Sequence, residues 1–150
     1  NKLLLGAAAL LAAIQFLPAP AKTNPPVDTA RTFDAAMHPP APVRDVLRRA
    51  CYDCHSDETR WPWYADIAPV SYPVRQHVLD GRRHLNFSTW LAPGESSFSS
   101  WSDLEDICTV LKDNSMPLAG YDWMHPEAKL NPTERQAVCA WVDERLANAR

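Results

Sequence analysis

The run Cys51-Tyr52-Asp53-Cys54-His55 constrains the fold of this chain more than any other stretch of its sequence. A Cys-x-x-Cys-His run is typical of covalent attachment of a c-type haem. On a helix the two cysteines lie on one face, where their sulfurs can bond to the two vinyl groups at one edge of a porphyrin. The histidine follows as the proximal iron ligand. The sequence therefore predicts haem c as the cofactor, bound through Cys51 and Cys54, with His55 as a metal ligand.

A zinc site is the main alternative for this run, and it needs a second pair of ligands at metal-binding spacing. The two other cysteines, Cys108 and Cys139, stand alone in the sequence, so we favour haem. Their own state has two interpretations. An oxidising compartment favours a disulfide, whereas the apolar helical face around Cys108 favours a small buried thiol.

The composition fits one haem-containing domain. A chain of 150 residues has room for one ordinary domain plus a leader or a linker. Its net charge of -3 argues against nucleic acid as a partner. Six tryptophans and 46% apolar residues suggest a core that is completed by a large, flat, apolar ligand.

Residues 1–21 are predicted to be a hydrophobic signal or membrane anchor. The apolar run from Leu3 to Leu17 has the length of a signal-peptide core, and a spanning helix needs about 20 apolar residues. A cleaved signal and a retained anchor both place the rest of the chain in the bacterial periplasm. Residues 22–42 are rich in proline and are predicted to be an extended linker, in which Met37 and His38 are exposed to solvent.

Residues 43–150 are predicted to be the haem-binding domain, and their apolar residues recur at helical spacing. This spacing predicts one helix over residues 43–51 and another around residues 104–111. The segment Trp61-Pro62-Trp63-Tyr64 is too rich in bulky rings and proline to be regular, so it is expected to be a loop over an apolar surface.

Two further helices carry their own start or stop signals. One runs from about residue 71 to residue 80, and Gly81 is expected to end it. The other begins with Asn131 as its cap, Pro132 at its first position and Glu134 completing a capping box. No run alternates convincingly with period two, so the predicted fold class is all-α.

The order of these features resembles a class I cytochrome c: a helix, the Cys-x-x-Cys-His run, short helices and loops, a Met-Pro and a terminal helix. More specifically, short motifs between about Val43 and Trp141 resemble those of a family of small bacterial haem-binding domains. The motifs are Cys51-Tyr52-Asp53-Cys54-His55-Ser56, Trp61-Pro62-Trp63-Tyr64, Ile67-Ala68-Pro69-Val70-Ser71, His77-Val78, Gly81-Arg82-Arg83, Leu85-Asn86-Phe87-Ser88 with Trp90, Met116-Pro117 and His125-Pro126. The resemblance implies a cytochrome c-like helical domain wrapped around a covalently bound haem. Such proteins have a hydrophobic N-terminal segment ending near a Gln-Phe, as Gln15-Phe16 does here, which favours a retained anchor.

The resemblance to cytochromes c also implies a partner for the second ring nitrogen of His55. In cytochromes c that nitrogen donates to a proline carbonyl a short way downstream, which fixes the tautomer of the ring. Pro69 is the candidate acceptor here.

The two haem propionates need hydrogen-bond donors and positive charge beside an apolar pocket. We expect Arg75, Arg82 or Arg83 to supply the charge, together with the N–H of Trp61 or Trp63. The alternative is that these arginines form a solvated face for an acidic partner.

Met116 is predicted to be the distal axial ligand, because a Met-Pro that follows a helix can hold a flexible thioether side chain against iron. Its rivals are Met124, His77, His84 and His125.

A haem with histidine and methionine ligands points to electron transfer with a redox partner protein that the sequence does not name, rather than to an enzyme. Two alternatives remain. One is a gas or redox sensor or a peroxidase-like enzyme with an open distal site, and the other is a haem module that only mediates assembly with a membrane partner.

Overall fold

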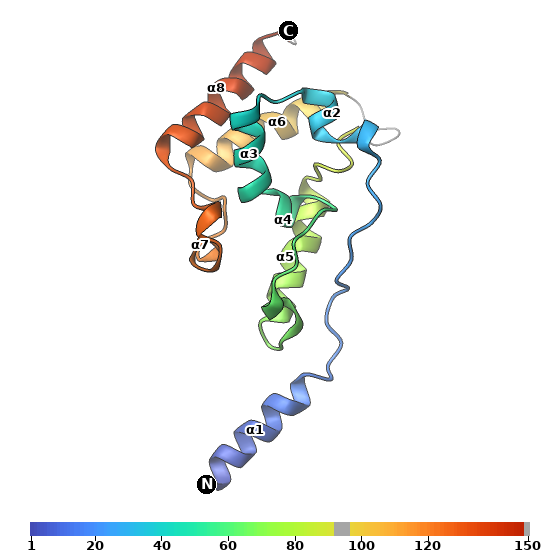
Figure 1. Ribbon diagram of the computed structural model, residues 1–150, viewed down its shortest axis with the longest axis vertical. Helices are drawn as coiled ribbons and strands as arrows, with labels where there is room; N and C mark the ends of the chain where they lie inside the picture. The colour runs from blue at the N-terminus through green and yellow to red at the C-terminus, as the bar shows by residue number, and fades with distance from the viewer. Residues whose placement is uncertain (92–96, 149–150) are drawn as a thin grey trace.

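The computed structural model describes residues 1–91 and 97–148, and every regular element in these residues is a helix (Figure 1). The predicted all-α fold class is confirmed. The α-helices are α1 (Lys2–Ile14), α2 (Phe33–Met37), α3 (Ala41–Ala50), α4 (Tyr52–His55), α5 (Ser71–His84), α6 (Ser97–Lys112), α7 (Tyr121–Met124) and α8 (Pro132–Asn148). Short 3-10 helices are η1 (Thr29–Arg31), η2 (Trp63–Asp66) and η3 (Pro126–Ala128).

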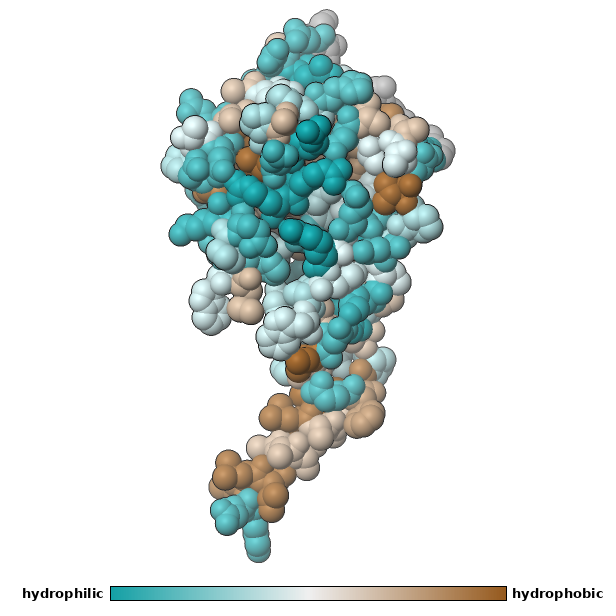
Figure 2. All heavy atoms as spheres, in the orientation of Figure 1, coloured by the Kyte–Doolittle hydropathy of each residue, from teal (hydrophilic) through white to brown (hydrophobic). Residues whose placement is uncertain are grey.

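Helix α1 extends away from the other helices, and an irregular segment beside α5 joins it to the rest of the chain (Figure 1). None of its residues is buried. Figure 2 shows the resulting hydrophobic surface at the N-terminal end of the molecule. Among the described residues, no helix combines the length and the apolar character needed to cross a bilayer.

The helix ends that the sequence marks most clearly lie where they are predicted. At the start of α8 the amide of Asn131 donates to the carboxylate of Glu134 over 2.9 Å, and the amide of Glu134 donates to the Asn131 side chain over 2.9 Å. Pro132 occupies the first helical position, where its missing N–H costs nothing. Helix α3 corresponds to the helix predicted over residues 43–51, and it buries Val43, Val46, Leu47 and Ala50.

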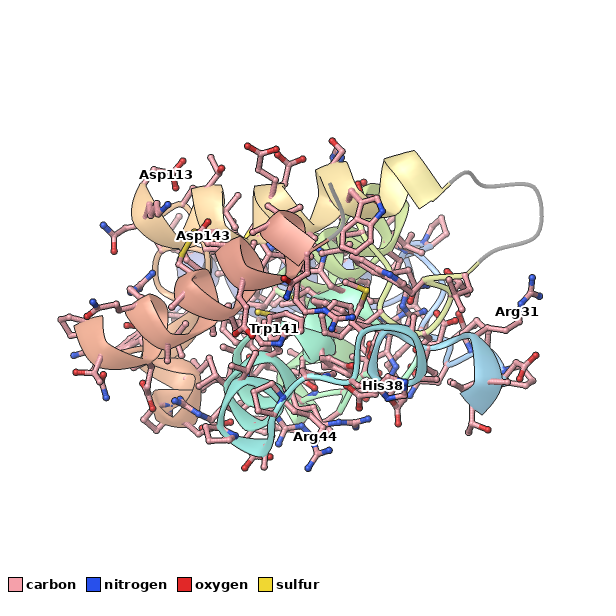
Figure 3. All side chains as sticks on the ribbon, turned by 90° about the horizontal axis from the view of Figure 1, so that it is seen from above. Arg31, His38, Arg44, Asp113, Trp141 and Asp143 are labelled. Carbon is pink, nitrogen blue, oxygen red and sulfur yellow. A yellow bond between two sulfur atoms is a disulfide. The ribbon has the colours of Figure 1, made fainter. Side chains whose placement is uncertain are left out.

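The core of the domain is built around the ring of Phe33, which is completely buried. Three aromatic rings meet it edge-on, with centroid distances of 5.1 Å to Phe87, 4.7 Å to Trp90 and 5.8 Å to Trp141. Figure 3 shows Trp141 between the helices, whereas Arg31 and Asp113 lie at the periphery. Several of the tryptophans therefore serve the core, an alternative use of this residue type.

The predicted linker over residues 22–42 differs from the structure in its second half. Phe33 and Met37 lie four positions apart on α2, and both are buried in the core. Thr32 caps this helix by accepting a hydrogen bond in its first turn. The expectation that Met37 is exposed was wrong, because its helical spacing with Phe33 turns it inward. His38 is exposed as predicted.

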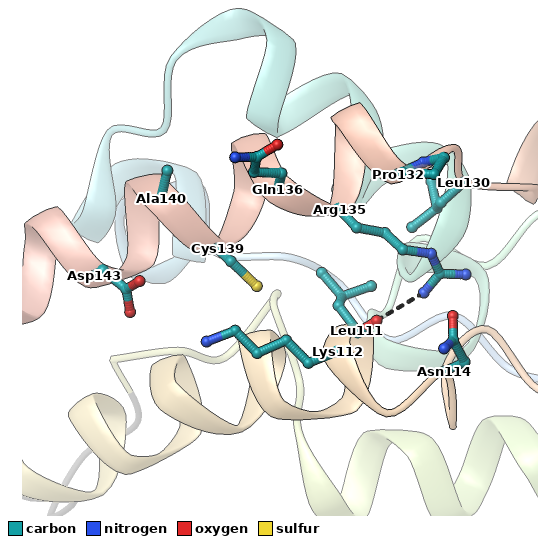
Figure 4. A pocket seen from close by; sticks show the side chains of 10 residues that line it. All are labelled: Leu111, Lys112, Asn114, Leu130, Pro132, Arg135, Gln136, Cys139, Ala140 and Asp143. Atoms are coloured by element: carbon teal, nitrogen blue, oxygen red, sulfur yellow. Dashed lines mark hydrogen bonds between the residues drawn. The ribbon is translucent and has the colours of Figure 1, made fainter.

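Helices α6 and α8 pack against each other and are joined by a disulfide between Cys108 and Cys139, with 5.0 Å between their Cα atoms. This finding decides between the two predicted states of these cysteines. Arg135 of α8 donates to the carbonyl oxygens of Leu111 (3.0 Å) and Met116 (3.2 Å), which fastens the end of α6. An open groove of about 710 Å³ lies along this pair of helices, with Arg135 and Cys139 among its lining residues (Figure 4).

Candidate haem site

The Cys-x-x-Cys-His run lies on α4, which follows α3 directly at Cys51. The ring of Tyr52 points into the core and stacks on Phe87, with centroids 4.7 Å and planes 5° apart. Cys51 and Cys54 are half-buried, and both are free thiols. The stacked Tyr52 thus fixes how α4 is rotated.

Helix α5 packs on α4 more closely than any side chain at Gly81 would allow. A Cβ atom at Gly81 would lie 2.5 Å from the carbonyl oxygen of Cys54 and 3.1 Å from the carbonyl carbon. Gly81 is buried, and α5 continues through it to His84. The prediction that Gly81 ends the helix was therefore wrong. The absence of a side chain serves close helix packing beside the Cys-x-x-Cys-His run.

His55 is held through one ring nitrogen by the backbone that follows α5. Its Nδ1 lies 3.2 Å from the carbonyl oxygen of Leu85, and the carbonyl of His55 accepts the amide of Phe87 over 2.8 Å. The acceptor is a backbone carbonyl, as expected, but it belongs to Leu85 and not to Pro69. Pro69 is exposed in the loop before α5. Pro69 follows His55 in the sequence but precedes α5. The chain contacts α4 again only at residues 81–87, at the end of α5 and just after it.

This contact assigns the two ring nitrogens of His55 different roles. With Nδ1 donating to Leu85, Nε2 is the nitrogen that remains for iron. Burial lowers the pKa of His55, partly offset by hydrogen bonds to the Leu85 and Gly81 backbone. The neutral imidazole, which is the form that binds metals, is therefore favoured.

The environment of the two free thiols differs from that of a reactive dithiol. Burial raises the pKa of Cys51 to about 12, with a further contribution from Cys54. Burial and the Asp53 carboxylate raise the pKa of Cys54 to about 11. Redox-active Cys-x-x-Cys pairs have lowered pKa values instead. This pair is therefore poorly suited to thiol–disulfide exchange at neutral pH.

Asp53, inside the run, connects α4 to two neighbouring segments. Its carboxylate is buried and accepts from the Arg60 amide (3.0 Å) and the Arg60 guanidinium (2.8 Å). The hydroxyl of Tyr121 donates to the same carboxylate over 3.1 Å, which draws α7 against α4. The sequence alone predicts no role for Asp53. A carboxylate between two attachment cysteines with an arginine a few positions later was the available signal.

A tyrosine–histidine pair lies close to Cys54. The hydroxyl of Tyr64 and Nε2 of His125 are 2.6 Å apart, and Tyr121 stacks on the His125 ring at 4.3 Å. Burial and then the nearby Cys54 and Asp53 raise the pKa of Tyr64. The predicted loop around Tyr64 and the segment around His125 therefore meet beside the attachment helix.

Exposed apolar side chains on these two segments fit a flat apolar group attached at Cys54. Trp63 precedes Tyr64, and Trp123 and Met124 precede His125; all three are exposed. With two free thiols and a histidine that has one ring nitrogen uncommitted, the residues present fit a covalently attached haem.

The donors predicted to reach the haem propionates make other contacts. Arg75 donates to the carbonyl oxygen of Pro20 over 3.2 Å. Arg82 (2.9 Å) and the indole N–H of Trp61 (3.2 Å) both donate to the Asn24 side chain. These three residues hold the N-terminal segment, and a role at the propionates stays a prediction for them.

Two of the predicted propionate contacts remain accessible. Trp63 is exposed and packs edge-on against Tyr64. Arg83 is exposed and pairs with Asp80, one turn earlier on α5.

Met116, the predicted distal ligand, is half-buried in the loop between α6 and α7. Its amide donates to the carbonyl oxygen of Val110 over 3.2 Å, and its own carbonyl accepts from Arg135. The backbone of the loop is thus held on both sides. Ligation by Met116 stays a prediction. Three of its rivals are exposed: Met124, His77 and His84.

A zinc site finds little support in the residues that the structure describes. No group of three or more histidine, cysteine, aspartate or glutamate side chains gathers there in an arrangement that could hold a metal ion. Cys108 and Cys139 are bonded to each other, so neither is a free thiolate for a site at Cys51 and Cys54.

A comparison with protein families finds one match, to a haem-binding domain, over residues 9–144. The chain belongs to this haem-binding domain family. Haem is therefore the cofactor that the domain binds, in agreement with the resemblance seen in the sequence. The matched region begins inside α1, so the family unit includes the segment beside α5. Neither the curated proteins nor the solved structures give a match.

Proposed function

We propose that this haem-binding domain is a periplasmic c-type cytochrome that transfers electrons. One observation carries the proposal. The four cysteines are divided by the fold, with Cys108 and Cys139 joined in a disulfide and Cys51 and Cys54 left free beside His55. Thioether attachment uses both remaining thiols and needs a histidine at this position.

The attached haem supplies one-electron redox chemistry. The residues around it keep their geometry during such a change. Tyr52 stacked on Phe87 and Gly81 against Cys54 hold α4 from two sides. The Leu85 carbonyl fixes the ring of His55 and its tautomer. A site that rearranges little suits electron transfer.

Met116 completes the proposal as the sixth ligand. Its backbone is fixed by Val110 and Arg135, so the flexible thioether is presented from a fixed point. Methionine and histidine together raise the haem potential. A filled sixth position leaves no place for a substrate, so we propose an electron carrier rather than an enzyme.

One observation favours a second candidate, an open distal site that senses or activates a small molecule. Tyr64 and His125 form a hydrogen-bonded pair close to Cys54, and such a pair can donate a proton to a bound ligand. In this case Met116 is not a ligand.

The proposed location is the periplasm, with attachment to a membrane through α1. A disulfide persists in oxidising compartments, and the Cys108–Cys139 bond is consistent with one. The apolar side chains of α1 are exposed and have no place in the core of the domain. The redox partner is a second protein that exchanges electrons with the exposed side of the haem.

Absorption spectroscopy of the purified protein tests the proposal and separates it from the second candidate. We expect the ferric protein to show the weak near-infrared band of a sulfur–iron bond, and the ferrous protein to resist carbon monoxide. Met116→Ala should abolish the band and allow carbon monoxide to bind. If the wild-type protein lacks the band and binds carbon monoxide readily, the open-site candidate replaces the electron carrier.

A further inference from the structure

The segment after α1, which its proline content predicts to be extended, is bound along the outside of the domain. Gln15, at the end of α1, begins this contact. Its side-chain amide donates to the carbonyl oxygen of Ala68 over 3.0 Å and accepts from the Ala68 amide over 2.9 Å. Both polar ends of one side chain are therefore used on one residue of the loop before α5.

The contacts continue at short intervals along the segment. The hydroxyl of Tyr72 donates to the carbonyl oxygen of Leu17 over 2.9 Å. Arg75, one turn further along α5, donates to the carbonyl oxygen of Pro20. Proline lacks an N–H, so a proline-rich segment offers mainly carbonyl oxygens, and side-chain donors on α5 suit it.

The far end of the segment reaches the residues that follow the haem-attachment run. Arg82 donates to the carbonyl oxygen of Thr23 (2.8 Å), and Asn24 donates to the carbonyl oxygen of Thr59 (2.9 Å). Arg82 also donates to the carbonyl oxygen of Ser56 over 2.7 Å. Residues 15–24, named the strap below, therefore connect α1 to the haem site through direct hydrogen bonds.

Two exposed apolar side chains flank Ala68, the residue to which Gln15 is hydrogen-bonded, in the sequence. Ile67 is 47% exposed and Val70 is 46% exposed, and Ala68 lies between them. Figure 2 shows the hydrophobic colour continuing from α1 onto the adjoining end of the domain. The apolar side chains of α1 that are most exposed are Leu3, Leu4, Leu5, Leu10 and Leu11.

The chemistry of α1 indicates lipid rather than a protein groove as the occupant of this surface. A helix that is apolar around its whole circumference matches a hydrocarbon environment, whereas a groove in a protein takes one apolar stripe. Lys2 is its only charged residue, and a lysine at one end favours anionic lipid head groups.

We propose that the strap joins α1 rigidly to the haem domain, so that α1, Ile67 and Val70 together form one surface that contacts a lipid bilayer. The proposal rests on the membrane attachment proposed above and adds to it. Attachment through a free tether leaves the domain at any angle to the membrane. The strap holds the haem-attachment helix at one fixed orientation to the lipid surface.

Vesicle flotation followed by hydrogen exchange tests the proposal on the full haem-loaded chain. The vesicles contain phosphatidylcholine and phosphatidylglycerol. We expect the wild-type protein to float with them, and amide exchange in the loop over residues 67–70 to slow at least several-fold when vesicles are added. The peptide over residues 85–91, in which Leu91 is equally exposed at 47%, should exchange at an unchanged rate.

Gln15→Ala should still float but lose the lipid-dependent protection of the loop, because α1 is then no longer clamped to Ala68. Gln76→Ala removes an exposed amide of the same type from α5 and serves as the matched control. Replacing Ile67 and Val70 by serine should also abolish the protection, whereas Leu91→Ser should not.

The outcomes separate the two proposals. If the wild-type protein does not float, the membrane attachment is wrong. If it floats and the loop exchanges equally with and without vesicles, the oriented surface is wrong although attachment stands. If the loop is protected without lipid and the protein self-associates, the surface of α1, Ile67 and Val70 contacts a second copy of this chain and not lipid. None of these readouts depends on the axial ligands of the haem.

Discussion

The two pairs of cysteines in this protein have opposite fates, although all four side chains are the same. Cys108 and Cys139 are 31 positions apart on α6 and α8 and are joined. Cys51 and Cys54 lie three positions apart, at the start of α4 and within it, and both are free thiols. The disulfide of the first pair joins two long helices, α6 and α8. The second pair lies beside a histidine with one nitrogen uncommitted, between a stacked tyrosine and a glycine contact.

The difference shows that neighbouring residues, and not cysteine chemistry alone, decide which pair is joined and which pair stays free. The α6–α8 region is held by a covalent bond and apolar packing. The α4–α5 region is held by buried polar contacts that leave the thiols available.

Arg82→Ala should have the largest effect, because it breaks the polar support of the α4–α5 region. The Arg82 side chain is 10% exposed and its partner Asp57 is 7% exposed, at 3.5 Å. Removing one member of a buried ion pair costs about 3–5 kcal/mol, since the other charge stays buried without its partner. Urea unfolding measures the loss. Arg83→Ala, at a site that is 70% exposed, is the control and should change stability by less than about 0.5 kcal/mol. Equal losses for the two variants would contradict this account.

Replacing Cys108 and Cys139 together by serine should cost about 3–4 kcal/mol, as expected for a loop of this length. The haem should remain attached, because the α4–α5 region is held by other contacts. Thermal unfolding and the haem absorbance after acid–acetone extraction measure the two effects. Loss of attachment in this variant would show that the two regions are not independent.

Gly81→Ala should destabilise the protein by about 1–3 kcal/mol, because the new methyl group overlaps the Cys54 carbonyl. It should also lower the fraction of chains that carry haem. The matched control is Gly6→Ala, which also lies within a helix and has nothing within 4 Å of its added Cβ. Both changes raise helix propensity, so the difference in stability and haem content between them isolates the contact with Cys54.

Tyr64→Phe should have the smallest effect, about 1 kcal/mol, because it removes one hydrogen bond to His125 at a half-buried site. With Met116 as the sixth ligand, this variant should keep the near-infrared band and resist carbon monoxide. A marked change in carbon monoxide affinity would instead assign the Tyr64–His125 pair to an open distal site.

The all-helical fold was predictable because its signals are local. The capping box at Asn131 and Glu134 forms as its spacing predicts, and α3 follows its apolar periodicity. Helix α2 was not predicted, because a helix of five residues among prolines is too short to show helical periodicity. It is stabilised by burial of Phe33 and Met37 in the core, which the sequence does not show. Haem as the cofactor was predictable because the residues of the Cys-x-x-Cys-His run are adjacent in sequence.

The surroundings of the haem site were less predictable because they depend on contacts between distant segments. Leu85 replaces Pro69 at His55 because α5 returns the chain to α4 beyond Gly81. A glycine followed by arginines without a turn residue was a signal for a helix that continues, and it was interpreted as a stop. Arg75 and Arg82 also donate to carbonyl oxygens of Pro20 and Thr23, in a segment that the sequence predicts only to be extended, so these contacts could not be anticipated.

Counting the cysteines that react with an alkylating agent distinguishes haem-bound from free thiols at Cys51 and Cys54. The wild-type protein is unfolded without reductant, alkylated and weighed intact. We predict a chain that carries the mass of one haem and no alkyl group, because two cysteines are in thioethers and two are in the disulfide. Prior reduction should add two alkyl groups, at Cys108 and Cys139. A chain without haem that gains two alkyl groups at Cys51 and Cys54 before reduction would contradict the account.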